Sequence, residues 1–330
     1  MGSPAISILV PVYNGLPYFK ECIDSVLAQN FYDWELFISD NGSIDGTREY
    51  LGTLTDPRIR IVLQEKNLGP WGNLNFLFQE AAAPISQILC ADDSMVPGAL
   101  SKIMHCWAET PAEIVSLRFN WSLLSQSFRY KISHQMLPLE CSPKNSDFRY
   151  FIFGCLQGSL SNVGIRTATI NERGGFRQDL PFAGDFDFWS KMSRDHPWKA
   201  VEEIVTWVRP HEGQASSYLN RNGEGVKQQL QVRQECFTRV AGKCSNLLLR
   251  TRGSWDYFRF IHQGFRTLML EKRIGPLLEV FRQSRQPMHL PRIFAYLLYV
   301  GTINGRIGAD FTTRALIKSW NSRNPSARIG

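Results

Sequence analysis

The chain has 330 residues, 43% hydrophobic and 12% aromatic, so it can bury one large domain or one domain with an appendage. This composition excludes a disordered or collagen-like protein, and no apolar run approaches the roughly 18 to 20 residues that cross a bilayer. Residues 1–225 carry 19 Lys and Arg against 25 Asp and Glu (net −6), whereas residues 226–330 carry 18 against 5 (net +13). This asymmetry indicates a different surface role for the C-terminal third.

The seven cysteines are scattered along the chain, and none are spaced CxxC, so neither a zinc site nor a disulfide framework is expected. Cys90 is interpreted as a small buried hydrophobic residue rather than a nucleophile. The first strand begins at Ile6, which leaves no room for a signal peptide. We therefore expect a cytoplasmic protein.

Strand-like and helix-like segments alternate over the first 119 residues. Apolar runs bounded by turn residues predict strands at 6–12, 34–39, 59–63, 88–91 and 114–119. Helical periodicity predicts helices at 16–29, from 45, from about 69 to 83, and from about 97. The alternation predicts an α/β fold with a largely parallel central sheet flanked by helices.

The alternation weakens beyond residue 119. Residues 120–145 have the pattern of an excursion or hairpin, and the elements expected after them are a helix at 146–153, a strand at 159–165, a helix at 184–194 and a strand at 204–209. From about residue 224 the pattern is helical throughout, with pieces near 226–248, 255–269, 275–284, 290–302 and 310–320. The sequence thus predicts a helical C-terminal extension.

Two adjacent acids, Asp92 and Asp93, follow an apolar strand directly. Three earlier strands also end in polar loops, at 13–14, 40–43 and 67–69. Parallel strands bring such loops together at one sheet edge, where α/β proteins bind ligands. No GxGxxG or P-loop motif is present, so a metal must neutralise any bound phosphates; Mn²⁺ and Mg²⁺ favour carboxylate ligands. A solvated surface turn is the alternative for an Asp-Asp pair seen alone.

Six segments, taken in order, resemble the family 2 glycosyltransferases of the GT-A fold: 6–14, 35–47, 66–69, 90–93, 174–189 and 208–216. The resemblance covers roughly residues 5–216. It implies a catalytic domain at 1–223, with its nucleotide-binding part at about 1–119 and its acceptor part at about 120–223. The basic helical region, 224–330, lies outside the resemblance.

The resemblance also implies a nucleotide site. Its expected members are Pro11, Tyr13 and Asn14 around the base, Asp40 as an acceptor from the base, Asn67, Gly69 and Asn73 along the nucleotide, and Asp92 near the ribose. The base is commonly uracil or thymine in such enzymes, so a UDP- or dTDP-type donor is expected. A plain turn at residues 13–14, a turn or helix cap at Asp40 and a turn former at Asn67 remain as structural alternatives.

The catalytic and metal groups follow from the same resemblance. Asp93 and His211 are the expected ligands of Mn²⁺ or Mg²⁺, and Arg209 approaches the diphosphate. Asp185 is the expected general base of an inverting transfer to a hydroxyl of a glycan or lipid-linked acceptor. Asp187 lies two residues further along a helix start and points elsewhere, so only one of the pair faces the crevice. A helix cap is the alternative for Asp185.

Two positions depart from the family pattern. An acid is common in relatives at Asn41, and another is common at Cys90. The second change leaves metal binding to Asp92 and Asp93 without the leading acid. Both changes are compatible with activity. The alternative function is that of a catalytically degenerate nucleotide-sugar-binding or scaffold protein of a polysaccharide assembly complex.

The basic C-terminal region interleaves arginines with aromatic residues at helical spacing. Part of this pattern is a helical cap with solvated arginines. The excess charge favours peripheral association with an anionic membrane, where a lipid-linked acceptor is found. A homo-oligomer contact is a further alternative, and nucleic-acid binding is not expected because no recognised motif accompanies the charge.

Overall fold

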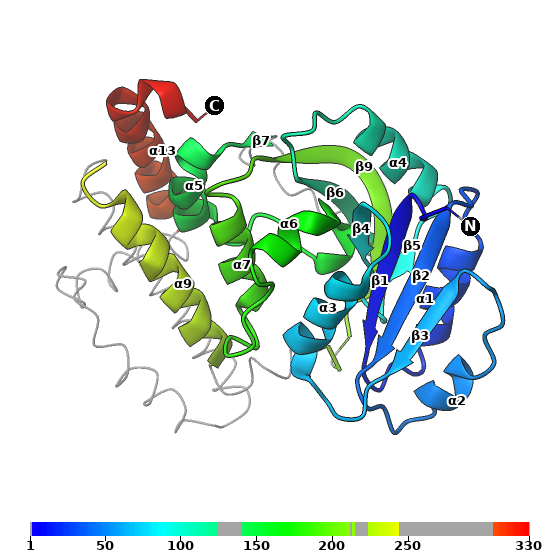
Figure 1. Ribbon diagram of the computed structural model, residues 1–330. Coiled ribbons are helices and arrows are strands. Elements are labelled where there is room, and N and C mark those ends of the chain that lie inside the picture. The colour runs from blue at the N-terminus through cyan, green and yellow to red at the C-terminus, as the bar shows by residue number, and fades with distance from the viewer. Residues whose placement is uncertain (1, 124–139, 212, 215–223, 244–305, 330) are drawn as a thin grey trace. The chain divides into compact units, whose positions relative to one another are not determined.

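The computed structural model describes residues 2–123, 140–211, 213–214, 224–243 and 306–329 (Figure 1). The chain divides into two compact units, one made of residues 1–141 and 155–211, the other of residues 142–154 and 212–330. The helices predicted at 255–269, 275–284 and 290–302 lie outside the described residues. The division of function at residue 223 stays a prediction.

The first unit is built on a mixed sheet. Its described strands are β1 (Ile6–Val12), β2 (Trp34–Asp40), β3 (Ile59–Leu63), β4 (Ile85–Ile88), β5 (Ser94–Met95), β6 (Ser116–Leu123), β7 (Glu140–Cys141), β8 (Val163–Arg166) and β9 (Trp198–Val208). They are ordered β3-β2-β1-β4-β8-β6-β9-β5, and β7 pairs with β9. The predicted α/β architecture is confirmed.

The parallel character that the sequence predicted belongs to one half of this sheet. Strands β3, β2, β1 and β4 are parallel neighbours. Beyond β4, strand β8 runs antiparallel to both β4 and β6, and β9 runs parallel to β6 and antiparallel to β5. A strand of two residues such as β5 is too short to show a hydrophobic periodicity in the sequence. It is recognised in the structure by its pairing with β9.

Helices cover both faces of the parallel half (Figure 1). The helices of this unit are α1 (Phe19–Leu27), α2 (Thr47–Leu51), α3 (Gly69–Glu80), α4 (Ala99–Ala108), α6 (Thr167–Glu172) and α7 (Gly184–Met192). Alternate residues of β1 and β2, among them Ile8 and Leu36, pack with the apolar faces of α1 and α4 in one core cluster. The opposite face carries α3, where Phe37 of β2 contacts Phe76 with ring centroids 6.1 Å apart.

The pairing of β5 with β9 decides where the site is built. Ser94 is opposite Trp207 and Met95 is opposite Thr206 in this antiparallel pair. In an antiparallel pair, each step forward along one strand is a step backward along the other. The residues that follow β9 therefore run alongside the acids that precede β5. The strand predicted at 204–209 is longer than expected and runs from Trp198 to Val208. Residues 209–211, which follow it, lie beside the acids that follow β4.

The second unit is helical where it is described. Its elements are α5 (Ser146–Phe153), α9 (Glu224–Val240), α13 (Arg306–Arg323) and short 3₁₀ turns at residues 143–145 and 325–327. Phe148 stacks on Trp320 at 4.5 Å between ring centroids, and Arg239 is ion-paired with Asp147 at 2.7 Å. Among the described residues, no helix combines the length and apolar character needed to cross a bilayer.

Candidate active site

The loops after β1 and β2 are tied together by hydrogen bonds. The backbone N–H of Asn14 donates to Ser43 Oγ (2.8 Å), and the N–H of Ile44 donates back to Asn14 Oδ1 (2.9 Å). The N–H of Gly15 donates to Thr47 Oγ1 (3.0 Å). Asn14 adopts a positive φ of 51°, a conformation that asparagine tolerates better than most residues. The chain thus bends at residues 13–14 and is bonded there to the loop that follows β2.

Asp40 ends β2 and has no exposed surface. Its Oδ2 accepts hydrogen bonds from Arg48 Nε (2.6 Å) and from the backbone N–H of Ser43 (3.2 Å). As placed, Asp40 orders its own loop. Tyr13, by contrast, is 52% exposed and presents ring surface at the same edge of the sheet.

The third loop is held by Asn41. Its amide Nδ2 donates to Asn67 Oδ1 (3.0 Å) and to the carbonyl of Gly69 (3.1 Å). Asn73 is buried on α3, and its amide donates to the carbonyl of Ser39 (2.9 Å). The structure therefore brings Asn67 and Gly69 against the loop that follows β2, and Asn73 fastens α3 to β2.

Asp93 is the buried member of the acid pair, with 3% of its surface exposed. Its Oδ1 accepts the backbone N–H of Arg209 (2.9 Å), and its Oδ2 accepts the hydroxyl of Ser161 (2.5 Å). Ser161 Oγ also accepts the N–H of Cys90 (2.9 Å). Burial, together with the charge of Asp92, raises the pKa of Asp93 to about 6.

Asp92 is the more accessible acid, and it meets His211. Asp92 Oδ2 lies 2.9 Å from His211 Nε2, and the two side chains are 27% and 19% exposed. Ligand atoms of Cys90, Asp92 and Asp93 also lie within 4.8 Å of one another. Carboxylate oxygens with one imidazole nitrogen form a donor set that suits Mn²⁺ or Mg²⁺. The two carboxylates of this cluster therefore fit the expected metal, and His211 is close to the cluster through Asp92.

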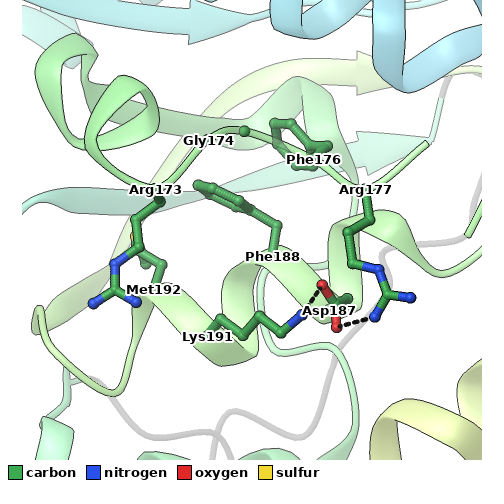
Figure 2. A pocket seen from close by; sticks show the side chains of 9 residues that line it. Arg173, Gly174, Phe176, Arg177, Asp187, Phe188, Lys191 and Met192 are labelled. Carbon is green, nitrogen blue, oxygen red and sulfur yellow. Dashed lines mark hydrogen bonds and ion pairs between the residues drawn. The ribbon is translucent and has the colours of Figure 1, made fainter. Parts of the chain in front are cut away.

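Asp185 and Asp187 occupy different environments on α7, as predicted from their spacing. Cys155 Sγ donates a long hydrogen bond (3.9 Å) to Asp185, and burial raises the pKa of Asp185 to about 6. Asp187 points to Lys191 Nζ (2.7 Å) and Arg177 Nη1 (3.7 Å), beside a cavity of about 190 Å³ (Figure 2). Asp187 is thus engaged in ion pairs, whereas the Asp185 side chain meets the Cys155 thiol from another segment of the chain.

The segment of residues 155–161 contacts both acidic groups of the site. Its Cys155 reaches Asp185, and its Ser161 bonds to Asp93. Arg118 Nε holds the same segment by donating to the carbonyl of Gln157 (3.2 Å). No sequence signal pointed to Ser161, because a single serine outside any motif has no distinguishing spacing.

In this α/β fold, a carboxylate that follows β4 and a histidine that follows β9 meet at Asp92 and His211. The chain belongs to glycosyl transferase family 2, whose sequence model matches residues 7–171. The fold is similar to S. aureus TarS 1-349 solved with UDP-GlcNAc (TM-score 0.56, 14% identity, 97% of this chain, 90% of that chain). It is also similar to PcManGT from Pyrobaculum calidifontis, solved with GDP-Man and Mn²⁺ (TM-score 0.50, 16% identity, 98% and 88%).

Relatives known by sequence match this chain over part of its length. An uncharacterized glycosyltransferase of Rickettsia felis is 27% identical over 225 residues, 67% of this chain and 36% of the relative. A Campylobacter jejuni GalNAc(5)-diNAcBac-PP-undecaprenol beta-1,3-glucosyltransferase is 35% identical over 105 residues, 31% of this chain and 34% of the relative. The chain thus spans about a third of the length of these two relatives.

Proposed function

We propose that the protein transfers a sugar from a nucleoside-diphosphate sugar, of UDP or dTDP type, to a hydroxyl of a glycan or lipid-linked acceptor. The observation that carries this proposal is the approach of Asp92 Oδ2 to His211 Nε2 at 2.9 Å, at the edge where the nucleotide loops meet. The donors bound by TarS and PcManGT and the lipid-diphosphate named for the Campylobacter relative support the same class of reaction.

Asp92 and His211 would hold Mn²⁺ or Mg²⁺, with Asp93 behind them. The sequence favoured Asp93 as the ligand, but both of its oxygens already accept protein hydrogen bonds, so Asp92 is the better-placed donor. Asp93 then fixes the residues after β9 through the N–H of Arg209. When bound, the metal would supply positive charge that stabilises the leaving diphosphate.

Asp185 is the proposed general base. Its carboxylate would take the proton of the acceptor hydroxyl while that oxygen forms a bond to the anomeric carbon. The bond from this carbon to the diphosphate oxygen breaks, and its electron pair leaves with the nucleoside diphosphate. Attack opposite the leaving group inverts the anomeric centre. A raised pKa suits the role, because a stronger base takes the proton more readily.

A binding protein without turnover is the second candidate. The feature that favours it is Cys90, which stands where relatives often carry an acid beside Asp92 and Asp93. Such a protein would bind the nucleotide sugar with metal yet release no nucleoside diphosphate, either by hydrolysis or in the presence of acceptors.

The test is a panel of nucleoside-diphosphate sugars with and without Mn²⁺, scored by thermal shift and by donor hydrolysis. Stabilisation by one donor only with metal, lost in Asp92→Asn and retained in the surface variant Asp179→Asn, supports the proposed site. Hydrolysis of that donor separates the enzyme from the binding protein. Donor binding that is indifferent to both metal and Asp92 would refute the proposal.

A further inference from the structure

Arg209 links three separate parts of the chain beside the acid pair. Its backbone N–H donates to Asp93 Oδ1 (2.9 Å), and its Nε donates to the carbonyl of Asp92 (3.3 Å). Its Nη2 is ion-paired with Glu21 Oε2 on α1, 188 positions earlier in the chain. The guanidinium is thereby held between the acids after β4 and the first turns of α1.

Tyr18, the residue that precedes α1, contacts the side chains of both Arg209 and His211. The Arg209 guanidinium carbon lies 4.6 Å from the centre of the Tyr18 ring. The ring of His211 lies 4.8 Å from Tyr18 between centroids, at an interplanar angle of 51°. The imidazole therefore has Tyr18 against its ring and Asp92 at its Nε2.

We infer that Glu21 and Tyr18 are positioning residues, which set His211 beside Asp92 and so tune the metal affinity of the site. This inference rests on the proposed function, since it concerns the same metal. Glu21 anchors Arg209, Arg209 fixes the backbone after β9, and Tyr18 packs on the His211 ring. Groups that orient a metal ligand without touching the metal commonly change its affinity by tenfold or more.

The exposure of Glu21 separates this role from a role in folding. Its side chain is 52% exposed, so the ion pair with Arg209 contributes little to the stability of the fold. Glu21 Oε1 also accepts the hydroxyl of Ser94 (3.3 Å) in β5, which ties α1 to the strand that follows the acids. Loss of the carboxylate is therefore expected to loosen the His211 segment while the domain stays folded.

The experiment measures Mn²⁺ binding to the full chain by the electron paramagnetic resonance signal of free Mn²⁺. The titration is run without nucleotide and with UDP, dTDP or GDP. Glu21→Gln and Tyr18→Leu are expected to weaken Mn²⁺ binding on the order of tenfold, with the thermal unfolding midpoint little changed. The matched control is Lys20→Gln, which alters an exposed charge on the same turn of α1 and is expected to bind Mn²⁺ like the wild type.

The decisive comparison repeats Glu21→Gln in a His211→Ala background. If Glu21 acts through His211, the substitution has no further effect there. An equal loss in both backgrounds, or wild-type Mn²⁺ binding by Glu21→Gln, overturns the inference and leaves the proposed function standing. A wild-type protein that binds no Mn²⁺ with any nucleotide overturns the metal-dependent function and the inference with it.

Discussion

The environments of Asp185 and Asp187 predict opposite consequences for the same substitution. Asp185→Asn removes the proposed base, and kcat is expected to fall by about 10² to 10⁴ with donor affinity unchanged. Asp187→Asn removes the charge that meets Lys191 at 2.7 Å, and the free energy of unfolding is expected to fall by about 1–3 kcal/mol. Steady-state kinetics and urea unfolding of both variants test this. A larger kcat loss in Asp187→Asn would reverse the assignment.

The pKa of Asp185 predicts the acid limb of the reaction. Burial raises this pKa to about 6, and the base must be ionised, so kcat/KM is expected to rise with pH through about 6. The pKa of Asp93 is also raised to about 6. Donor affinity is therefore measured over the same range of pH, to separate donor binding from proton transfer. An acid limb centred near pH 4 at constant donor affinity would contradict the role of Asp185.

The same shift has a consequence for stability with a defined sign. A carboxyl whose folded pKa lies above its unfolded value binds its proton more tightly in the folded state. Its contribution to stability is therefore complete below the unfolded pKa and is lost as pH rises through about 6. As the proposed base, Asp185 would act in the protonation state that the fold disfavours, which is common for buried catalytic acids and bases.

At the scale of elements, the loop between β3 and α3 depends on an amide at position 41. Asn41 is buried, and its Nδ2 meets two acceptors, Asn67 Oδ1 and the Gly69 carbonyl. Asn41→Asp sets carboxylate oxygens against those acceptors. We expect the free energy of unfolding at pH 7 to fall by about 1–3 kcal/mol, with the deficit shrinking at low pH as the acid is protonated.

Asn67→Asp is the matched control for this prediction. Asn67 is exposed, and its Oδ1 only accepts hydrogen bonds, from Asn41 and from the N–H of Gly69, which a carboxylate also does. Denaturant unfolding of the two variants at pH 7 and pH 4 makes the comparison. Equal stability of Asn41→Asp and the wild type at pH 7 would show that the amide is dispensable.

The start of α7 depends on the absence of a side chain at Gly184. A Cβ added there would lie 2.5 Å from Trp71 Nε1, which donates to the carbonyl of Leu180 (2.9 Å). Gly184→Ala is expected to lower the free energy of unfolding by about 1–3 kcal/mol, since the indole has to move. Gly52→Ala is the control, because its Cβ would meet only the carbonyl oxygens of Glu49 at 3.4 Å and Arg48 at 3.7 Å, which is ordinary van der Waals contact. Similar effects of the two variants would contradict the packing argument.

The elements themselves were largely predictable because their signals are local. The strands at 6–12 and 59–63 and the helix at 146–153 have the predicted bounds. The run at 88–91 is different: the ladder of β4 ends at Ile88, and Leu89 makes one further bond to the carbonyl of Leu9 before the chain turns. An apolar run reports burial, which continues past the point where strand pairing ends.

At the scale of the molecule, the sequence could not show which distant segments pair. The parallel half followed from alternating elements, whereas the insertion of β8 between β4 and β6 and the pairing of β5 with β9 depend on long-range contacts. The site shows the same division. Asp92, Asp93 and Asp185 are predicted from motifs, but the contacts of Ser161 and Glu21 are not, because their partners lie 68 and 188 positions away in the chain.

The basic charge of the C-terminal region leads to a prediction about where the proposed enzyme works. Residues 226–330 carry a net charge of +13, and anionic lipid attracts such segments by about 1 kcal/mol for each basic residue near the surface. The full chain is expected to float with phosphatidylserine-containing vesicles at about 0.05 M salt and to be released at about 0.5 M, because salt screens the attraction. Neutral phosphatidylcholine vesicles are the control. Failure to float with anionic vesicles at low salt would remove the case for a peripheral enzyme acting on lipid-linked acceptors.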